Sequence, residues 1–390
     1  MIDRADSDIV ELAGELIGFE SENPPGAERE CAEFIADWFT ANDIDAELVA
    51  SPEPDRPSVA ARIGSGAPTL VLNGHTDVVP VDEPDDWSVE PYEGTIDGDR
   101  LYGRGSADMK TGVALAMVLA RDLAPIIEDD GTAGSLVVHA VAGEETGYPG
   151  AEAVLEAGYE GDMGIVLEPT HLRVATRAKG VSTFRLIIEG ESSHASRPDQ
   201  GHNPIDDLQR LLTEVHEYDA DLRSRSDPLC GQAFATVTQV DAGVDQNMAV
   251  IPGRAEVLMD RRVLPEETYE DVEAEVHELI ETLRAEGMRI ERELVQHYDS
   301  SIVESDCPVA QVVSSHANDI AGTATDPIGL EAATDARALV SAGIETIIWG
   351  PGSLEQAHTV DEWISLGEVK FARSILEQSI RELLNLDSDG

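Results

Sequence analysis

The chain has 390 residues, which is more than one compact core usually holds, so its length predicts two domains. Its 78 acidic and 26 basic residues give a formal net charge of -52, while the apolar share of 42% is that of a folded protein and argues against disorder. This charge would repel nucleic acids and anionic membranes, so neither is an expected partner.

The acidity has two interpretations, a cation-binding protein or an acidic, lysine-poor surface adapted to a salt-rich cytoplasm. We favour the second, because salt screens the self-repulsion of such a surface. No run approaches the roughly 20 apolar residues of a membrane span, and Met1 to Ile9 contain no apolar signal-peptide core. Cys31, Cys230 and Cys307 are scattered and form no disulfide or metal motif, which is typical of a reducing compartment. We therefore expect a cytoplasmic protein.

The first part of the chain alternates between helical and strand patterns. Amphipathic helices are expected over 6–19 and 28–40, with a break at Asn23-Pro24-Pro25-Gly26. Short apolar runs rich in β-branched residues then occur at 69–72, 135–141, 164–167 and 345–349. A long helix is expected between the first two runs, over 111–123. This order predicts an α/β domain with a mixed, mostly parallel sheet flanked by helices.

A different pattern fills the stretch between 179 and 289. Strands are expected at 181–189, 234–240 and 254–260, and helices at 204–220 and 266–285. The order β-α-β-β-α is typical of a small α+β domain with helices on one face of an antiparallel sheet. The sequence therefore predicts a domain formed by 1–178 and 290–390, with an inserted domain at 179–289.

Residues that can bind metal ions follow the strand patterns of the larger domain. They are His75 and Asp77 after the first run, Glu144 and Glu145 after the second, Glu168 after the third and His358 after the fourth. Asp108 precedes the helix expected from residue 111. Each residue alone could be solvated, or could belong to a turn or a helix cap. Because open α/β sheets bind ligands beyond the carboxyl ends of their strands, the set together predicts a site for zinc, cobalt or manganese.

Five segments resemble the signatures of one family of dizinc metallopeptidases, which includes acetylornithine deacetylase, succinyl-diaminopimelate desuccinylase, aminoacylase and carboxypeptidase G. In chain order they are Asn73-Gly74-His75-Thr76-Asp77-Val78-Val79-Pro80, Leu101-Tyr102-Gly103-Arg104-Gly105-Ser106-Ala107-Asp108-Met109-Lys110, Gly143-Glu144-Glu145, Glu168-Pro169 and Ala357-His358. The resemblance spans nearly the whole chain. It implies a zinc-peptidase-like catalytic domain with an inserted, ferredoxin-like lid and dimerisation domain.

The resemblance also implies a role for each metal-site residue. His75 and Glu168 would bind one zinc ion, Glu145 and His358 the other, and Asp108 would bridge them; cobalt or manganese could replace zinc. Asp77 would accept a hydrogen bond from His75 and so fix its tautomer. Glu144 would be the general base for attack by a metal-bound water. Spacing alone does not distinguish Glu144 from Glu145, so that assignment depends on the resemblance.

Further motifs imply the residues that contact substrate. The family's histidine motif is similar to Ser192-Ser193-His194-Ala195-Ser196-Arg197-Pro198. In relatives this histidine reaches the site of the partner subunit and stabilises the oxyanion, so the resemblance implies that role for His194. Asn247 would contact substrate, and Arg262 would bind its carboxylate, with Arg261 as the alternative if the register shifts by one. Thr334-Asp335-Ala336-Arg337 and Gly350-Pro351-Gly352 resemble substrate-side motifs, which makes Arg337 and Gly350 candidates.

These features together predict a homodimeric amidohydrolase that removes the acyl group from an N-acyl amino acid or N-acyl diamino acid. A dipeptidase or carboxypeptidase with the same two-metal site is the first alternative, with a short peptide as substrate. A non-catalytic dimeric binding protein on the same scaffold is the second. The chain departs from the family pattern at Thr111 and at Ala332-Ala333, and neither change affects a predicted ligand.

Overall fold

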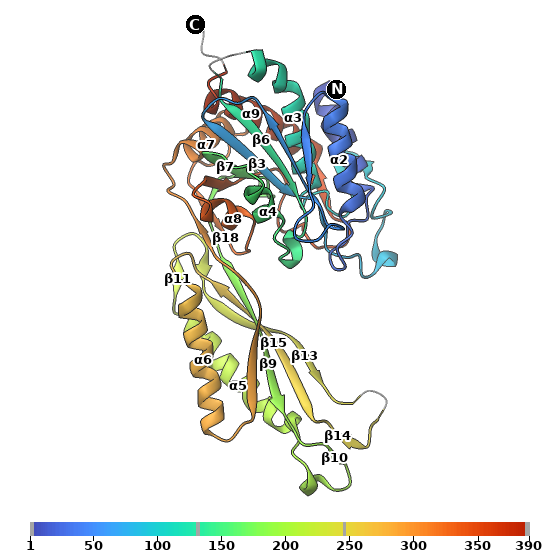
Figure 1. Ribbon diagram of the computed structural model, residues 1–390, viewed down its shortest axis with the longest axis vertical. Helices are drawn as coiled ribbons and strands as arrows, with labels where there is room; N and C mark the ends of the chain where they lie inside the picture. Colours follow the sequence, from blue (N-terminus) through green and yellow to red (C-terminus); the bar gives the residue numbers. More distant parts are fainter. Residues whose placement is uncertain (1–3, 130–132, 245–246, 387–390) are drawn as a thin grey trace. The chain divides into compact units, whose positions relative to one another are not determined.

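The computed structural model describes residues 4–129, 133–244 and 247–386, and it divides the chain into two compact units (Figure 1). Unit 1 comprises Met1–Thr176, Val303–Ile328 and Thr334–Gly390, and unit 2 comprises Arg177–Ile302 and Gly329–Ala333. The insert predicted at 179–289 lies within unit 2. Unit 2 continues beyond residue 289 because strand β16 (Ile290–Tyr298) pairs with β9 (Gly180–Glu189).

Unit 1 is built on a mixed sheet whose central strands are parallel. The strands of the main sheet, in spatial order, are β1 (Ala46–Val49), β2 (Ser58–Ile63), β6 (Ser135–Val141), β3 (Thr69–His75), β7 (Met163–Val166), β19 (Glu345–Ile348), β8 (Ala175–Ala178) and β17 (Ser301–Ile302), with β18 (Ile328–Leu330) also paired to β8. The four central strands, β6, β3, β7 and β19, run parallel, and the outer pairs are antiparallel. This arrangement confirms the predicted mixed sheet, although only the central strands are parallel to one another.

Helices cover both faces of this sheet because its central strands are apolar on both sides. The helices of unit 1 are α1 (Arg4–Ile17), α2 (Arg29–Ala41), α3 (Lys110–Asp129), α4 (Gly150–Glu156), α7 (Pro308–Ala321), α8 (Ala336–Ser341) and α9 (Leu366–Leu383). Leu70 and Leu72 of β3 belong to the core that α1, α2, α3, α7 and α9 share, whereas Val71 belongs to the core shared with α4 and α8. Such two-sided burial is expected of parallel strands.

Unit 1 also contains a three-stranded antiparallel sheet. Its strands are β20 (Trp363–Ser365), β5 (Arg100–Tyr102) and β4 (Thr95–Asp97), in that order. Short 3-10 turns occur at η1 (Pro84–Asp86) and η2 (Glu144–Thr146). None of the helices in the described parts of the chain is long and apolar enough to cross a membrane.

Unit 2 has the order β-α-β-β-α-β and a four-stranded antiparallel sheet with the order β13-β15-β9-β16. Its further elements are α5 (Pro204–Leu222), β13 (Phe234–Ala242), β15 (Arg254–Val263), α6 (Tyr269–Ala285), the pair β10 (Ser193–His194) and β14 (Val250–Ile251), the pair β11 (Ser226–Asp227) and β12 (Gly231–Gln232), and η3 (Pro198–Gln200). Alternate residues of β9, including Phe184 and Leu186, pack against α5 and α6 in one core. This α+β arrangement matches the predicted ferredoxin-like insert.

Candidate active site

The carboxyl ends of the four central parallel strands meet at one edge of the unit 1 sheet, as the sequence predicts. His75 is the last residue of β3, η2 follows the end of β6, and Glu168 follows β7. His358 lies on the segment after β19. Asp108 lies two residues before the start of helix α3. Parallel strands direct their ends to the same side, so residues far apart in the sequence can share one site.

Asp108 lies between two histidine–glutamate pairs. Its Oδ1 is 3.0 Å from Nε2 of His75, and that nitrogen is 3.9 Å from Oε1 of Glu168. Its Oδ2 is 3.5 Å from Nε2 of His358, and that nitrogen is 3.1 Å from Oε1 of Glu145. The two oxygens of one carboxylate therefore face two different pairs of side chains. The peptide bond between Asp108 and Met109 is cis.

These side chains concentrate negative charge in a buried place. Burial raises the pKa of Glu168 well above its usual value, and the Asp108 carboxylate raises it further. Burial also raises the pKa of Glu145, although its hydrogen bond to His358 opposes this. Burial lowers the pKa of His75, but the carboxylates around it, above all Asp108, raise it well above the usual value in total. The carboxylates of this site therefore lack enough positive charge around them to offset their burial.

The donor set fits divalent cations. Ligand atoms of His75, Asp108 and Glu145 all lie within 4.8 Å of one another. Imidazole nitrogen and carboxylate oxygen are ligands that zinc, cobalt and manganese accept. Cations between the two pairs would neutralise carboxylates that otherwise repel one another. The residues therefore fit a centre with two cations, one at each pair and Asp108 common to both.

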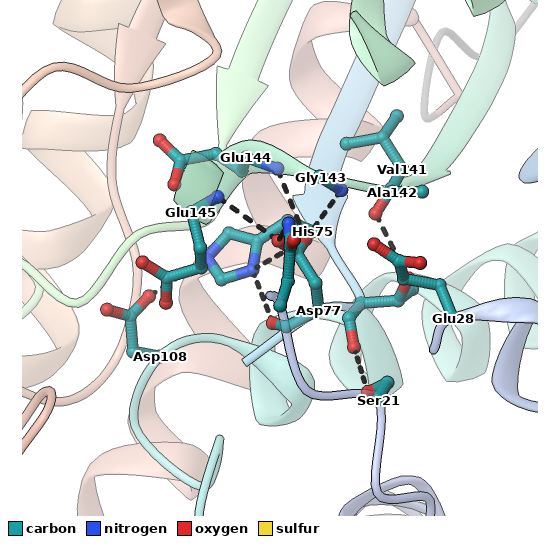
Figure 2. A network of polar contacts seen from close by, with 12 residues as sticks. Ser21, Glu28, His75, Asp77, Asp108, Val141, Ala142, Gly143, Glu144 and Glu145 are labelled. Carbon is teal, nitrogen blue, oxygen red and sulfur yellow. Dashed lines mark hydrogen bonds and ion pairs between the residues drawn. The ribbon is translucent and has the colours of Figure 1, made fainter. Parts of the chain in front are cut away.

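Asp77 holds the turn that carries Glu144 and Glu145, and Figure 2 shows its carboxylate at the centre of a hydrogen-bond network. Oδ1 accepts hydrogen bonds from the main-chain N–H groups of Gly143 (2.9 Å) and Glu144 (3.2 Å). Oδ2 accepts from the N–H of Glu145 (3.1 Å) and from the Asn23 amide (2.9 Å). A fully buried carboxylate with four donors is well satisfied, so it fixes the η2 turn relative to β3.

The interaction of Asp77 with His75 differs from the predicted one. Nδ1 of His75 lies 2.9 Å from the main-chain carbonyl of Asp77, whereas the Asp77 carboxylate is 3.7 Å away. The carbonyl can only accept, so Nδ1 carries the proton and Nε2 is left to bind a cation. Asp77 therefore fixes the tautomer of His75 through its main-chain carbonyl, and its carboxylate binds the η2 turn instead.

The geometry separates Glu144 from Glu145, which the spacing could not do. The Glu145 carboxylate points toward Asp108 in Figure 2 and pairs with His358. The Glu144 carboxylate points away from that pair in the same view. Burial raises the pKa of Glu144 well above its usual value, with the nearby carboxylates of Glu168 and Asp335 adding to the effect. A carboxyl with a raised pKa beside a metal site is suited to proton transfer.

Comparison with known proteins decides the family. Residues 71–382 match the peptidase family M20/M25/M40. The chain belongs to this family. It is 30% identical over 353 residues to the acetylornithine deacetylase of Pectobacterium carotovorum, covering 89% of this chain and 88% of that protein. It is 27% identical over 388 residues to a probable succinyl-diaminopimelate desuccinylase of Staphylococcus epidermidis, covering 92% and 94%.

Solved structures agree with this assignment. The fold is similar to that of an M20 family metallo-carboxypeptidase from Sulfolobus solfataricus, with a TM-score of 0.80 and 17% identity, covering 99% of this chain and all of that one (100%). This likeness shows the fold, whereas the family match and the relatives show that the M20-family chain is an enzyme that hydrolyses amide bonds. The predicted class of enzyme is confirmed, whereas its substrate stays a prediction.

Unit 2 of the M20-family chain holds three of the predicted substrate-side residues. The exposed His194 lies on β10, where its Nδ1 accepts a hydrogen bond from the N–H of Ser196 (3.1 Å). Asn247 is exposed, and its side-chain oxygen accepts from the N–H of Ala249 (3.3 Å). Arg262 is partly exposed and forms an ion pair with Asp260 at 2.9 Å. All three roles stay predictions.

The alternative to Arg262 is excluded by its position. Arg261 is fully buried, and its guanidinium contacts Tyr218, Glu267 and Glu275 inside unit 2. These partners consume its donors, so Arg261 stabilises the core of unit 2 and cannot bind a substrate carboxylate.

Two predicted substrate-side residues of unit 1 are engaged by their neighbours. Arg337 forms an ion pair with Glu152 of α4 at 2.5 Å, so a substrate carboxylate would have to compete with Glu152. Gly350 donates its N–H to Oγ1 of Thr170 (3.1 Å), and its carbonyl accepts from the N–H of Leu172 (3.0 Å). A Cβ at Gly350 would lie 2.7 Å from the carbonyl oxygen of Glu168. We infer that Gly350 allows the chain to pass closely behind Glu168.

Two residues at the site were not expected from the sequence. Asn23 lies in the segment that was predicted only as a break between helices, yet its amide holds Asp77. Asp335 lies in the Thr334-Asp335-Ala336-Arg337 motif, and it is 3% exposed with Oδ2 unbonded among the described residues. The position of Asp335 in this motif could have indicated that it lies at the site. Nothing in the sequence indicates that Asn23 contacts Asp77.

Proposed function

We propose that this M20-family enzyme is a deacylase that removes the acyl group from an N-acyl amino acid or an N-acyl diamino acid. N-acetylornithine and N-succinyl-diaminopimelate are the first candidates, because 89% or more of the chain aligns with relatives named for these substrates. The observation that carries the proposal is the position of Asp108 between the pairs His75–Glu168 and His358–Glu145.

The proposed reaction divides the work between the cations and the chain. Two divalent cations, zinc before cobalt or manganese, would activate the attacking water and polarise the scissile carbonyl when bound. Glu144 would take the proton of this water and pass it to the leaving amine. Asp77 would keep Glu144 in place, because its carboxylate accepts the hydrogen bond of the Glu144 main-chain N–H. Arg262 would bind the substrate carboxylate, and His194 would donate to the oxyanion.

We also propose that unit 2 forms the contact between two subunits of a homodimer. Its sheet has α5 and α6 on one face, and the edge strand β13 leaves Val240 exposed. An edge strand with an exposed apolar side chain is suited to pairing with a second copy. Light scattering coupled to size-exclusion chromatography in high salt tests this proposal. A monomer at micromolar concentration would contradict it.

Amine release from a panel of amides tests the substrate class. The panel contains N-acetylornithine, N-succinyl-diaminopimelate, simple N-acetyl amino acids and dipeptides, each measured with added zinc or cobalt in high salt. We expect the highest kcat/KM for an N-acyl amino acid or diamino acid. Faster cleavage of dipeptides would instead favour the peptidase alternative, and no turnover of any amide would contradict both.

A further inference from the structure

A second fully buried carboxylate, Glu362, holds the loop that carries Asp108. It lies immediately before β20 and is 0% exposed. Its Oε1 accepts hydrogen bonds from the main-chain N–H groups of Ala107 (2.8 Å) and of Asp108 itself (3.1 Å). Its Oε2 accepts from the N–H of Gly105 (3.0 Å) and from the guanidinium of Arg104 (3.0 Å). Four donors from five consecutive residues therefore converge on one side chain.

Other main-chain N–H groups of this loop find acceptors elsewhere: that of Arg104 donates to the carbonyl of Pro91 and that of Ser106 to the carbonyl of Gly103. Gly103 and Gly105 have positive φ angles of 152° and 83°, so the chain turns sharply before Asp108 and belongs to no helix or strand there. Main-chain N–H groups that are buried in such a turn need acceptors, because each unsatisfied group costs about 1–3 kcal/mol. Glu362 supplies acceptors for three of them. A neutral or shorter side chain could not do the same.

Glu362 also connects this loop to the second histidine of the site. It follows His358 by four residues on the same segment, and Arg104 bonds both to Glu362 and to the carbonyl of Thr359 (3.2 Å). The main-chain carbonyl of Glu362 accepts the N–H of Gly103 (3.0 Å). The segment that carries His358 and the loop that carries Asp108 are therefore joined through Glu362 and Arg104.

From this geometry we propose that Glu362 is a positioning residue that sets the distance between Asp108 and His358 and so determines the affinity of the cation site that these two share with Glu145. The inference rests on the proposed two-cation site, but it does not depend on the substrate. Glu362 touches neither a cation nor a substrate in this scheme. It acts through the main chain of Asp108, in the same way as Asp77 acts through the main chain of Glu144 and Glu145.

The isosteric variant Glu362→Gln tests the proposal. It keeps the volume, but it removes the charge and turns an amide NH2 group toward N–H donors. Titration calorimetry of the metal-free protein with Zn²⁺ and with Co²⁺ gives the affinities of both sites. We expect one of the two cation-binding steps to weaken by about 10- to 100-fold, as is usual when a group behind a metal ligand is removed. The visible spectrum of the Co²⁺-loaded variant should change, and kcat should fall while KM changes less than about twofold.

Asp227→Asn in unit 2 is the matched control. The Asp227 carboxylate is also buried, accepts two main-chain N–H groups on Oδ1, from Leu229 (2.7 Å) and Cys230 (2.8 Å), and pairs with Arg177 on Oδ2. This variant should lose stability in the same way as Glu362→Gln but bind both cations with wild-type affinity.

The outcomes separate the two proposals. Wild-type affinity and an unchanged Co²⁺ spectrum in Glu362→Gln would overturn the positioning role, whatever the variant does to the melting temperature. Equal losses of affinity in Glu362→Gln and Asp227→Asn would overturn it as well, since they would show a general effect of destabilisation. If Glu362→Gln does not fold, Glu362→Asp, which keeps the charge on a shorter side chain, is measured in the same way. Failure of the wild-type protein to bind two cations would instead contradict the proposed function.

Discussion

At the scale of single residues, two adjacent glutamates have different surroundings, which supports the different roles proposed for them. Glu145 pairs with His358 at 3.1 Å, whereas the Glu144 carboxylate points away from that pair in Figure 2. The difference arises from the η2 turn, in which successive side chains point in different directions (Figure 2). Asp77 fixes that turn through three main-chain hydrogen bonds, so the roles depend on a residue that binds neither cation nor water.

Glu144→Gln should lower kcat by about 10²- to 10⁴-fold, which is the usual contribution of a general base. Glutamine has the same shape and cannot accept the proton of the attacking water. Metal analysis should still give the wild-type content, because the role proposed for Glu144 is to accept a proton and not to bind a cation. Steady-state kinetics with the best amide of the panel checks the prediction. A variant that retains more than about a tenth of the wild-type kcat would show that another group is the base.

Asp335→Asn should stabilise the metal-free protein at neutral pH. Burial is the main reason that the pKa of Asp335 is raised from 3.8 to about 6; Arg337 lowers it, and Glu152 raises it. Because the folded-state pKa is the higher one, the group costs nothing below about pH 4. Its penalty grows between about pH 4 and pH 6 and stays at about 3 kcal/mol above that range, where the group is charged.

Urea unfolding of the metal-free wild type and of Asp335→Asn at pH 4.5 and 7.5 checks this pH dependence. We expect a gain of about 1–3 kcal/mol in unfolding free energy for the variant at pH 7.5 and a much smaller gain at pH 4.5. A variant that is equally stabilised at both pH values would show that the ionisation of Asp335 is not the cause.

At the scale of secondary-structure elements, the turn after β6 is shaped by glycine. Gly143 has a φ of 87°, and a Cβ at this position would lie 2.2 Å from Cβ of Tyr148. Gly143→Ala therefore combines a left-handed conformation with a steric clash, and we expect it to cost more than about 2 kcal/mol of unfolding free energy. Gly158→Ala is the control, because its φ is 95° and nothing lies within 4 Å of the added Cβ. Denaturant unfolding should rank Gly143→Ala as clearly the less stable; equal losses would show that the clash has no effect.

The elements that the sequence predicts best are those with the strongest apolar pattern. The strand over 135–141 has the same bounds in the structure as in the prediction, since every residue of β6 is buried. The helix expected over 111–123 extends to Asp129, because Pro125 is accommodated within α3. Strand β16 was not predicted: its middle residues are exposed, so it lacks the alternating pattern that indicates a strand.

The predicted metal-site residues come together because parallel strands determine which ends meet, and this rule can be applied to a sequence. The hydrogen bonds of Asp77 and Glu362 could not be predicted in the same way. They join positions up to 257 residues apart through main-chain N–H groups, which every residue except proline has. Side-chain chemistry identifies a candidate ligand, whereas only the folded chain shows which carboxylate holds it.

At the scale of the whole molecule, the net charge of -52 sets a dependence on salt. Many acidic side chains lie near one another on a chain with only 26 basic residues, so repulsion destabilises the folded state when screening is weak. The distance over which exposed charges interact falls from about 10 Å at 0.1 M salt to about 3 Å at 1 M, so added salt weakens the repulsion between them.

The melting temperature of the metal-free protein should therefore rise by several degrees or more between 0.1 M and 2 M KCl, and most of the rise should occur below about 1 M, where the screening length changes most. Thermal unfolding followed by circular dichroism measures it. Sucrose at equal osmolality is the control: it stabilises compact states by exclusion and leaves charges unscreened, so it should raise the melting temperature less. A melting temperature that is independent of KCl, or that rises equally in sucrose, would show that the acidic surface does not require salt and would remove the composition-based argument for a salt-rich cytoplasm.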